Sequence, residues 1–217
     1  AHRQARDQPG GRAEQRIGVP QAPLPADVEA VVIALKSRTT PAAAAVADAL
    51  AALDKLRAAG CRQFYFKYCS TFDSTDAGNI GPVADALLTA LDSDFTIACP
   101  AFPENQRTIF KGYLFVGDVL LSESGMRDHP LTPMTDANLV RVLQRQTTRK
   151  VGLIDYATVA AGSAAIRARS ARLRAEGVGI AIVDATSNDD LLQIGAACAD
   201  LKLVTAGSGI ALGLPQN

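Results

Sequence analysis

The sequence predicts an α/β fold: a mainly parallel sheet with helices on both faces, Rossmann-like in arrangement, with an extended hairpin or lid near residues 102–125. Two observations carry this prediction. Short apolar runs alternate with segments of helical spacing, as in βαβ units with right-handed crossovers. The runs are apolar throughout, which is typical of parallel strands that are buried on both faces.

The first elements follow one another in regular order. Residues 30–35 form the first predicted strand. Thr40 and Pro41 then predict a helix start, as an N-cap followed by proline at the first helical position. Apolar residues recur at helical spacing up to Gly60, which predicts the end of this helix. The next elements are a strand at 64–69, a helix at 81–91 and a strand at 95–99.

The middle of the chain interrupts this alternation. Residues 109–121 predict an extended hairpin that leaves the sheet, and residues 136–146 predict an amphipathic helix. The alternation resumes with a strand at 150–155, a helix at 158–176, a strand at 179–184, a helix at 188–199 and a strand at 202–205. Ligands of open parallel sheets bind beyond the carboxyl ends of the strands, and nearly every such end here is rich in hydroxyls, amides or small residues.

The composition excludes several classes of function. The 217 residues are 48% hydrophobic, enough for one large domain with a core. Basic and acidic residues are equal at 22 each, and aromatic residues are 5%, so we expect no nucleic-acid partner. No apolar run reaches the length of a membrane span and no secretory signal is recognisable, which predicts a cytoplasmic protein without a membrane partner.

The four cysteines lie outside any CxxC pair, which argues against a metal or redox site. We expect buried free thiols in a reducing compartment. They are Cys61, Cys69, Cys99 and Cys198.

Residues 1–16 differ from the rest, because they are rich in Arg, Gln and Gly and show no apolar period. We interpret them as a tail that is disordered or foreign to the fold, and residues 17–217 as one domain.

The loop after the first strand is a candidate anion site. Arg38 offers a planar fork that matches a carboxylate, and Ser37 and Thr39 flank it. The helix that follows adds free N–H groups at its N-terminus. The alternative is that the threonines only cap the helix and Arg38 is a solvated loop charge.

The segment from Lys67 to Asn79 carries the densest set of polar residues. Lys67 lies in an apolar strand, where an ammonium needs a partner such as Asp73 or a bound anion. Gly78 and Gly81 allow a close approach of the backbone. Hydroxyls that suit a polyhydroxy ligand come from Ser70, Thr71, Ser74 and Thr75. The alternative is an edge-strand lysine beside an ordinary turn.

These two loops are expected to meet at the same rim of the sheet and to hold a negatively charged polyol. Three weaker candidates are Arg107 in a lid-like loop, His129 in a proline-flanked turn, and the glycine-rich residues 205–209. The last lack the spacing of a P-loop, so a tight turn is their alternative, and a packing role is the alternative for His129.

The stretch KYCSTFDSTDAGNIGPV at residues 67–83 resembles the four-carbon acid sugar kinase family, and within it the 3-oxo-tetronate kinases. The resemblance covers the chain from Ile17 to its C-terminus. It recurs in LKSRTTP (35–41), PAFPENQRT (100–108), GYLFVGDVLLSESGM (112–126), HPLTPMTDANLVRVLQRQT (129–147) and TAGSGIALGLP (205–215).

Such enzymes transfer the γ-phosphoryl group of ATP to the terminal hydroxyl of a four-carbon sugar acid, of the 3-oxo-tetronate, erythronate or threonate type. Their N-terminal domain binds the acid and their C-terminal domain binds the nucleotide. The resemblance implies that Ser37, Arg38 and Thr39 bind the carboxylate. Arg107, in the lid-like loop, is a further candidate for substrate binding. The resemblance also implies a sugar pocket lined by Lys67, Ser70, Thr71, Asp73, Ser74 and Asn79.

The chain departs from the family in three ways. The Asp-Asp-Phe-Thr-Gly-Ala loop that follows the family's first strand is absent, so no catalytic residue can be named. The chain stops where the nucleotide domain should begin, so ATP and Mg²⁺ are expected for the full enzyme but not for this chain, which we expect to be inactive alone. Gln106 and Tyr113 stand where close relatives are expected to have Gly and His.

Three alternatives remain open at this point. The chain could be a stand-alone binding module for a small sugar acid, a degenerate inactive fragment, or a nucleotide-binding protein that uses residues 205–209. A missing first strand would leave an unpaired edge, which favours a homodimer.

Overall fold

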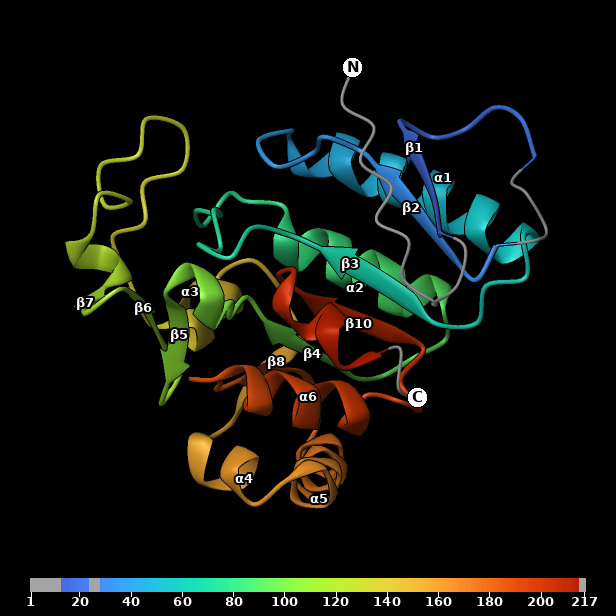
Figure 1. Cartoon of the computed structure of the whole chain (residues 1–217). Coiled ribbons are helices and arrows are strands. Elements are labelled where there is room, and N and C mark those ends of the chain that lie inside the picture. The colour runs from blue at the N-terminus through green and yellow to red at the C-terminus, as the bar shows by residue number, and fades with distance from the viewer. Residues whose placement is uncertain (1–12, 24–27, 215–217) are drawn as a thin grey trace.

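The computed structural model describes residues 13–23 and 28–214, and its centre is a five-stranded sheet in the order β3-β10-β4-β9-β8 (Figure 1). Every pairing in this sheet is parallel. The predicted α/β fold is confirmed. The strands are β3 (Phe64–Lys67), β4 (Thr96–Cys99), β8 (Lys150–Ile154), β9 (Val178–Val183) and β10 (Leu203–Ala206).

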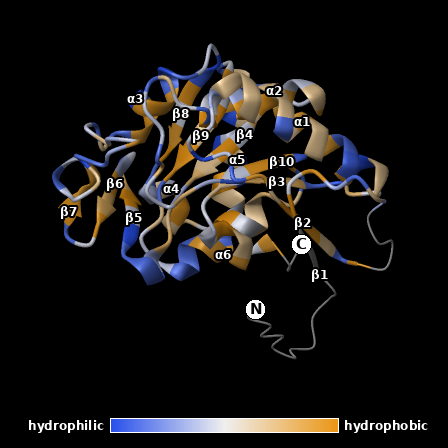
Figure 2. Cartoon of the chain, turned by 90° about the horizontal axis from the view of Figure 1, so that it is seen from above, coloured by the Kyte–Doolittle hydropathy of each residue, from blue (hydrophilic) through white to orange (hydrophobic). Residues whose placement is uncertain are grey.

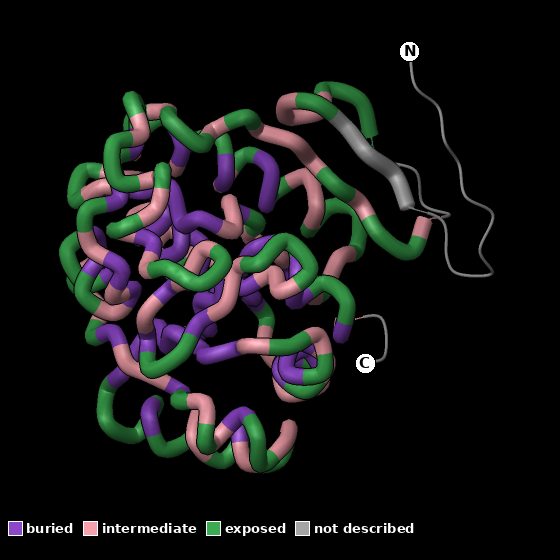
Figure 3. The backbone as a smooth tube through the Cα atoms, turned by 60° about the vertical axis from the view of Figure 1, so that its left-hand side comes forward, coloured by how far each residue is buried: buried purple, intermediate pink, exposed green. Residues whose placement is uncertain are grey.

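Helices cover both faces of the sheet (Figure 1). One face carries α1 (Ala42–Ala58), α2 (Ile80–Ala90) and α3 (Leu139–Gln144), and the other carries α4 (Tyr156–Ala160), α5 (Ser163–Ala175) and α6 (Asn188–Ala197). All residues of β4, β9 and β10 are buried between these layers. Figures 2 and 3 show the same arrangement as apolar, buried central strands within a more polar surface. The core therefore lies in the sheet, as continuous apolar strands require.

A small antiparallel sheet leaves the main one after β4. It consists of β5 (Arg107–Phe110), β6 (Tyr113–Val116) and β7 (Val119–Leu120), so the predicted hairpin gains a third strand. Asp184, at the end of β9, is fully buried and accepts N–H groups from Lys111 at 2.7 Å, Gly112 at 2.8 Å and Tyr156 at 2.9 Å. Burial raises the pKa of this carboxyl, while the three donors oppose the rise. Asp184 thus fixes the hairpin turn to the main sheet.

The N-terminal strands differ from the prediction. Strand β2 (Ala30–Ala34) is not part of the main sheet; it pairs in parallel with β1 (Ala13–Ile17), in register from Ala13–Ala30 to Ile17–Ala34. The interpretation of residues 1–16 as a tail is therefore wrong for residues 13–16, and residues 1–12 lie outside the described part. A strand therefore precedes β2 in the described part of the chain and pairs with one of its edges. Strand pairing uses backbone groups, so it does not require an apolar period.

Two helix boundaries also differ. The single helix predicted at 158–176 is divided into α4 and α5 at Gly162, whose φ of 88° lies in the left-handed region. Thr40 was expected to cap α1, but Pro41 is the N-cap and α1 starts at Ala42. Thr40 instead closes a turn, in which its N–H donates to the Ser37 carbonyl at 3.1 Å.

The four cysteines are free, as predicted. Cys99 and Cys198 are buried, whereas Cys61 and Cys69 are only half-buried, so the expectation of burial holds for two of them. Among the described helices, none has the length and apolar character needed to cross a membrane.

Candidate functional site

The loop around Arg38 and the loop at residues 70–79 meet, although β2 and β3 belong to different sheets. Arg38 Nη1 lies 3.3 Å from Asp73 Oδ2. The Asn79 amide donates to the carbonyl oxygens of Ser37 at 2.7 Å and Thr40 at 2.9 Å. The predicted convergence of the two segments is therefore present in the structure, while the ligand-binding roles of their residues remain predictions.

Both loops contain a non-glycine residue in the left-handed region: Lys36 with φ 56° and Phe72 with φ 50°. This conformation is uncommon for residues with a Cβ and is kept where the surrounding structure enforces it. Phe72 is fully buried, and its ring lies edge-on to that of Tyr68 at 5.3 Å. The aromatic contact therefore anchors the loop between Thr71 and Asp73 in the core.

Asp73 is the central polar group of the site. Its side chain is 3% exposed, whereas that of Arg38 is 58% exposed. The Thr71 hydroxyl donates to Asp73 Oδ1, and Cys69 Sγ lies 3.0 Å from the same hydroxyl. An ionised carboxylate only accepts hydrogen bonds, and a guanidinium only donates them. The pair therefore presents an acceptor for a ligand hydroxyl beside a donor for a ligand carboxylate.

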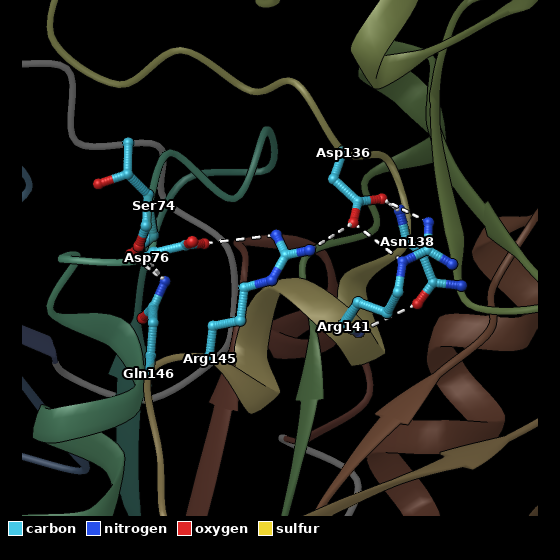
Figure 4. Close-up of polar contacts among 8 residues, drawn as sticks. Ser74, Asp76, Asp136, Asn138, Arg141, Arg145 and Gln146 are labelled. Atoms are coloured by element: carbon cyan, nitrogen blue, oxygen red, sulfur yellow. Dashed lines mark hydrogen bonds and ion pairs between the residues drawn. The ribbon is translucent and has the colours of Figure 1, made fainter.

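The second half of the loop is held by Gln146, just after α3 (Figure 4). The Gln146 amide donates to Ser74 Oγ at 2.9 Å and to the Thr75 carbonyl at 2.7 Å, and its Oε1 accepts the Gly81 N–H at 3.0 Å. Sequence reasoning missed this residue. The signal was present, because Gln146 continues the buried positions Leu139 and Val142 at helical spacing, where a polar residue is unusual.

A cavity of about 390 Å³ lies beside this contact, within the size range of small-molecule sites. Arg145 lies across it, 3.4 Å from an oxygen of Asp76 and 3.7 Å from one of Asp136 (Figure 4). The hydrogen bond from Arg141 lowers the pKa of Asp136. The lining residues are Ser74, Thr75, Asp76, Ala77, Pro133, Met134, Thr135, Asp136, Val142 and Arg145.

Lys67 does not lie as expected. It is exposed, and its ammonium contacts no partner within the described ranges. Of the two partners expected for Lys67, Asp73 is ruled out because it pairs with Arg38, and a bound anion stays a prediction. Lys67 ends β3, an edge strand that pairs only with β10 among the described strands, so solvent can reach it.

The other predicted residues lie around or away from the Arg38–Asp73 pair. Thr39 is exposed and Ser70 is half-buried. Arg107 begins β5 in the antiparallel sheet, where its guanidinium donates to the Asn105 carbonyl. No contact between Arg107 and the Arg38 loop occurs in the part of the chain that the structure describes.

Several polar residues at strand ends cap helices or stabilise turns. Asp155 caps α4 by accepting the Thr158 N–H at 3.1 Å, and Ser187 forms a capping box with Asp190 at the start of α6. His129 Nδ1 accepts the Thr132 N–H at 3.1 Å within its own turn, which favours the packing role. The expectation that these polar ends mark ligand contacts is thus too broad.

The glycines of residues 205–209 also have a packing role. A Cβ on Gly207 would lie 2.7 Å from the Pro100 carbonyl oxygen, and one on Gly209 would lie 2.5 Å from that of Ala101. Both glycines are buried against the segment after β4. This geometry favours the tight turn over a phosphate cradle.

Comparisons with known proteins identify the family of the chain. The family model for a sugar-binding N-terminal domain matches residues 10–214. A 3-oxo-tetronate kinase of Burkholderia multivorans is 70% identical over 96% of this chain and 49% of its own length. The chain thus spans about half the length of the curated relatives it matches.

Solved structures also resemble this chain in fold. A Haemophilus influenzae protein superposes with a TM-score of 0.93 at 53% identity, over 95% of this chain and 50% of that one. A Bordetella bronchiseptica protein, described as a domain-swapped dimer with bound citrate, gives 0.77 at 27% identity, over 95% of this chain and 50% of that one. The resemblance seen in the sequence is confirmed, and the chain belongs to the family of sugar-binding N-terminal domains.

Proposed function

We propose that this chain is the acid-sugar-binding half of an ATP-dependent kinase that phosphorylates the terminal hydroxyl of a four-carbon sugar acid, of the 3-oxo-tetronate, erythronate or threonate type. The observation that carries the proposal is the Arg38–Asp73 pair, which joins a carboxylate-binding group to a hydroxyl-binding group. The names of the curated relatives support the substrate class.

Each part of the site has a chemical role in this proposal. Arg38, which is more than half exposed, binds the ligand carboxylate, with Ser37 and Thr39 beside it. Asp73 accepts a ligand hydroxyl. Asn79 holds the Arg38 loop in place through two carbonyl oxygens.

The remaining sugar-pocket residues keep the roles that the family resemblance implies. Ser70, Thr71 and Ser74 line the pocket. The exposed ammonium of Lys67 adds positive charge at the end of β3, and Arg107 lies in the lid. Positioning and charge neutralisation are what a phosphoryl acceptor site needs from its protein.

ATP and Mg²⁺ belong to a second domain in this proposal, because the chain spans only about half the length of the curated kinases that it matches. The chain alone is then inactive. A kinase acts where ATP is present, which places the protein in the cytoplasm. The dimeric relative with bound citrate supports both a small carboxylic acid as ligand and a homodimer as assembly.

Calorimetry tests the binding role. The chain is titrated with erythronate, threonate and 3-oxo-tetronate, and with erythritol as a neutral polyol of the same length. We expect at least one acid to bind, erythritol to bind far more weakly, and the R38A variant to lose binding of the acid. Absence of binding by all three acids, or equal binding by R38A, would overturn the proposal and favour a degenerate chain.

Addition of a separately produced nucleotide domain tests the kinase role. With ATP, Mg²⁺ and the bound acid, we expect ADP formation that requires both proteins. Binding of the acid without turnover under these conditions would favour a stand-alone binding module. Binding of ADP by the chain alone would instead favour the nucleotide-binding alternative.

A further inference from the structure

We propose that Gln146 is a positioning residue, which orients the Ser74 hydroxyl so that its proton points to a ligand oxygen in the cavity between residues 74–77 and 133–136. The inference rests on the proposed function and deepens it. The proposed site otherwise consists of the two loops. The inference adds Gln146, which follows the end of α3, and the cavity wall formed by residues 133–136.

The orientation of the Gln146 amide follows from its partners. The Thr75 carbonyl can only accept a hydrogen bond, so the group facing it at 2.7 Å is the NH₂. The Gly81 N–H can only donate, so the group facing it at 3.0 Å is the oxygen. Both ends of the amide are thereby assigned from neighbouring backbone groups, and the amide cannot flip without losing two hydrogen bonds.

The Ser74 hydroxyl still has its O–H to donate. It accepts one N–H of Gln146 at 2.9 Å, while the other N–H of that amide is used by Thr75. Ser74 is 2% exposed, and its own O–H has no acceptor within the described residues. A buried hydroxyl normally satisfies its donor. Because Ser74 lines the cavity, a ligand oxygen there is the acceptor that completes its hydrogen bonding.

Two glycines make room for this arrangement. A Cβ on Gly78 would lie 1.9 Å from Ser74 Oγ, and a Cβ on Gly81 would lie 2.6 Å from the Gln146 Cβ. The backbone at Gly78 therefore lies close to the Ser74 hydroxyl, and the backbone at Gly81 lies close to the Gln146 side chain, which only glycine allows. The contact between Ser74 and Gln146 is thus enclosed on two sides.

Ser74 adds a donor to the site beside Asp73, and of these two neighbours only Ser74 lines the cavity. Asp73 can only accept hydrogen bonds, whereas Ser74 accepts one from Gln146 and has its own O–H left to donate. A hydroxy acid in the cavity offers carboxylate and hydroxyl oxygens, either of which can accept the Ser74 proton. The Gln146 amide therefore contributes to the recognition of the acid without touching it.

A double-mutant cycle tests this role. Erythronate affinity is measured by calorimetry for the unchanged chain, for S74A, for Q146M and for the double variant, with folding checked by circular dichroism and urea unfolding. We expect S74A and Q146M each to weaken binding by about tenfold, the size of one lost hydrogen bond. Because Gln146 acts through Ser74, Q146M should add little further loss in the S74A background.

Gln144 provides a matched control on the same helix. Its amide donates to the carbonyls of Thr147 at 3.2 Å and Arg149 at 2.9 Å, away from the 70–79 loop. We expect Q144M to leave erythronate affinity unchanged even if it lowers the urea midpoint. Q146N, which keeps the amide but withdraws it by one methylene, serves in the cycle if Q146M does not fold.

The outcomes separate the two proposals. If the unchanged chain binds erythronate but the losses from S74A and Q146M are additive, the positioning role is wrong and the proposed function stands. An equal loss in Q144M also overturns it, since a general effect of the helix would then explain the data. If the unchanged chain binds none of the acids, the proposed function is wrong and this inference with it.

Discussion

Arg38 and Asp73 form an ion pair of 3.3 Å between loops whose strands, β2 and β3, lie in different sheets. The guanidinium is largely exposed and the carboxylate is buried. This asymmetry leaves donors of Arg38 free to bind a ligand while Asp73 keeps it in place.

Replacement of Arg38 by alanine should separate binding from stability. A pair with one exposed partner stabilises a fold by only about 0–1 kcal/mol, so the urea unfolding free energy should change little. Erythronate affinity should fall by about tenfold or more, since charge-assisted bonds to a carboxylate are strong. Arg62, an exposed arginine outside both loops, gives the control variant R62A. Equal affinity of R38A and R62A would contradict the assignment.

Asn79 should matter for stability as well as for binding. Its buried amide bridges the carbonyls of Ser37 and Thr40, so N79A removes two hydrogen bonds and should cost about 1–3 kcal/mol of unfolding free energy, although the Ser37 carbonyl keeps the Thr40 N–H. N79D should cost more, because a carboxylate would face two carbonyl oxygens. The exposed Asn105 offers a control, and N105A should unfold at the same urea concentration as the unchanged chain. A neutral N79A would contradict the bridging role.

The contribution of Asp136 should depend on pH. The hydrogen bond from Arg141 lowers the pKa of Asp136 below its ordinary value of 3.8, so the unfolded chain binds this proton more readily than the folded one. The resulting stabilisation is complete above pH 3.8 and is lost as the pH falls through the folded-state pKa. Urea unfolding at pH 7, 5 and 3.5 should show D136N less stable at pH 7, with the difference shrinking at the lowest pH. A difference that grows on acidification would contradict this sign.

Gly81 should not tolerate a side chain. A Cβ there would meet Gln146 Cβ at 2.6 Å and the Gln146 carbonyl oxygen at 2.7 Å, so G81A should lower the unfolding free energy by about 1–3 kcal/mol. Gly125 has open space around its Cβ position, and G125A should change stability by less than about 0.5 kcal/mol. Thermal unfolding compares the two variants directly. Equal melting temperatures would contradict the close approach of Gly81 to Gln146.

The four thiols should fall into two classes. Burial raises the pKa of Cys99 and of Cys198 to about 12, so both remain protonated and unreactive at pH 8. Cys61 and Cys69 are half-buried and accessible to reagents. Titration of the native chain with a thiol-specific disulfide reagent at pH 8 should therefore label no more than two thiols, and urea should release the other two. Labelling of all four before unfolding would contradict the burial of Cys99 and Cys198.

The sequence indicated where the site lies but not how its groups pair. The motif at 67–83 and the Arg38 loop were recognisable from residue types alone, and the structure brings them together. Lys67 looked buried because its neighbours are apolar, yet an edge strand leaves it exposed. Asp155 and Ser187 belong to the polar strand ends that the sequence associates with ligand binding, yet each caps a helix. Strand ends and helix starts favour the same polar residues, so composition cannot separate the two roles.

What the sequence determined by itself was the local order of elements, because period, glycine and proline act within a few residues. Only the tertiary structure decided that Asp73 pairs with Arg38, that β2 pairs with β1, and that Gln146 meets Ser74 from 72 residues away. The physical reason is that buried polar groups must find partners wherever packing brings them. The packing of the folded chain determines which partners these groups meet, and the residues adjacent in sequence do not.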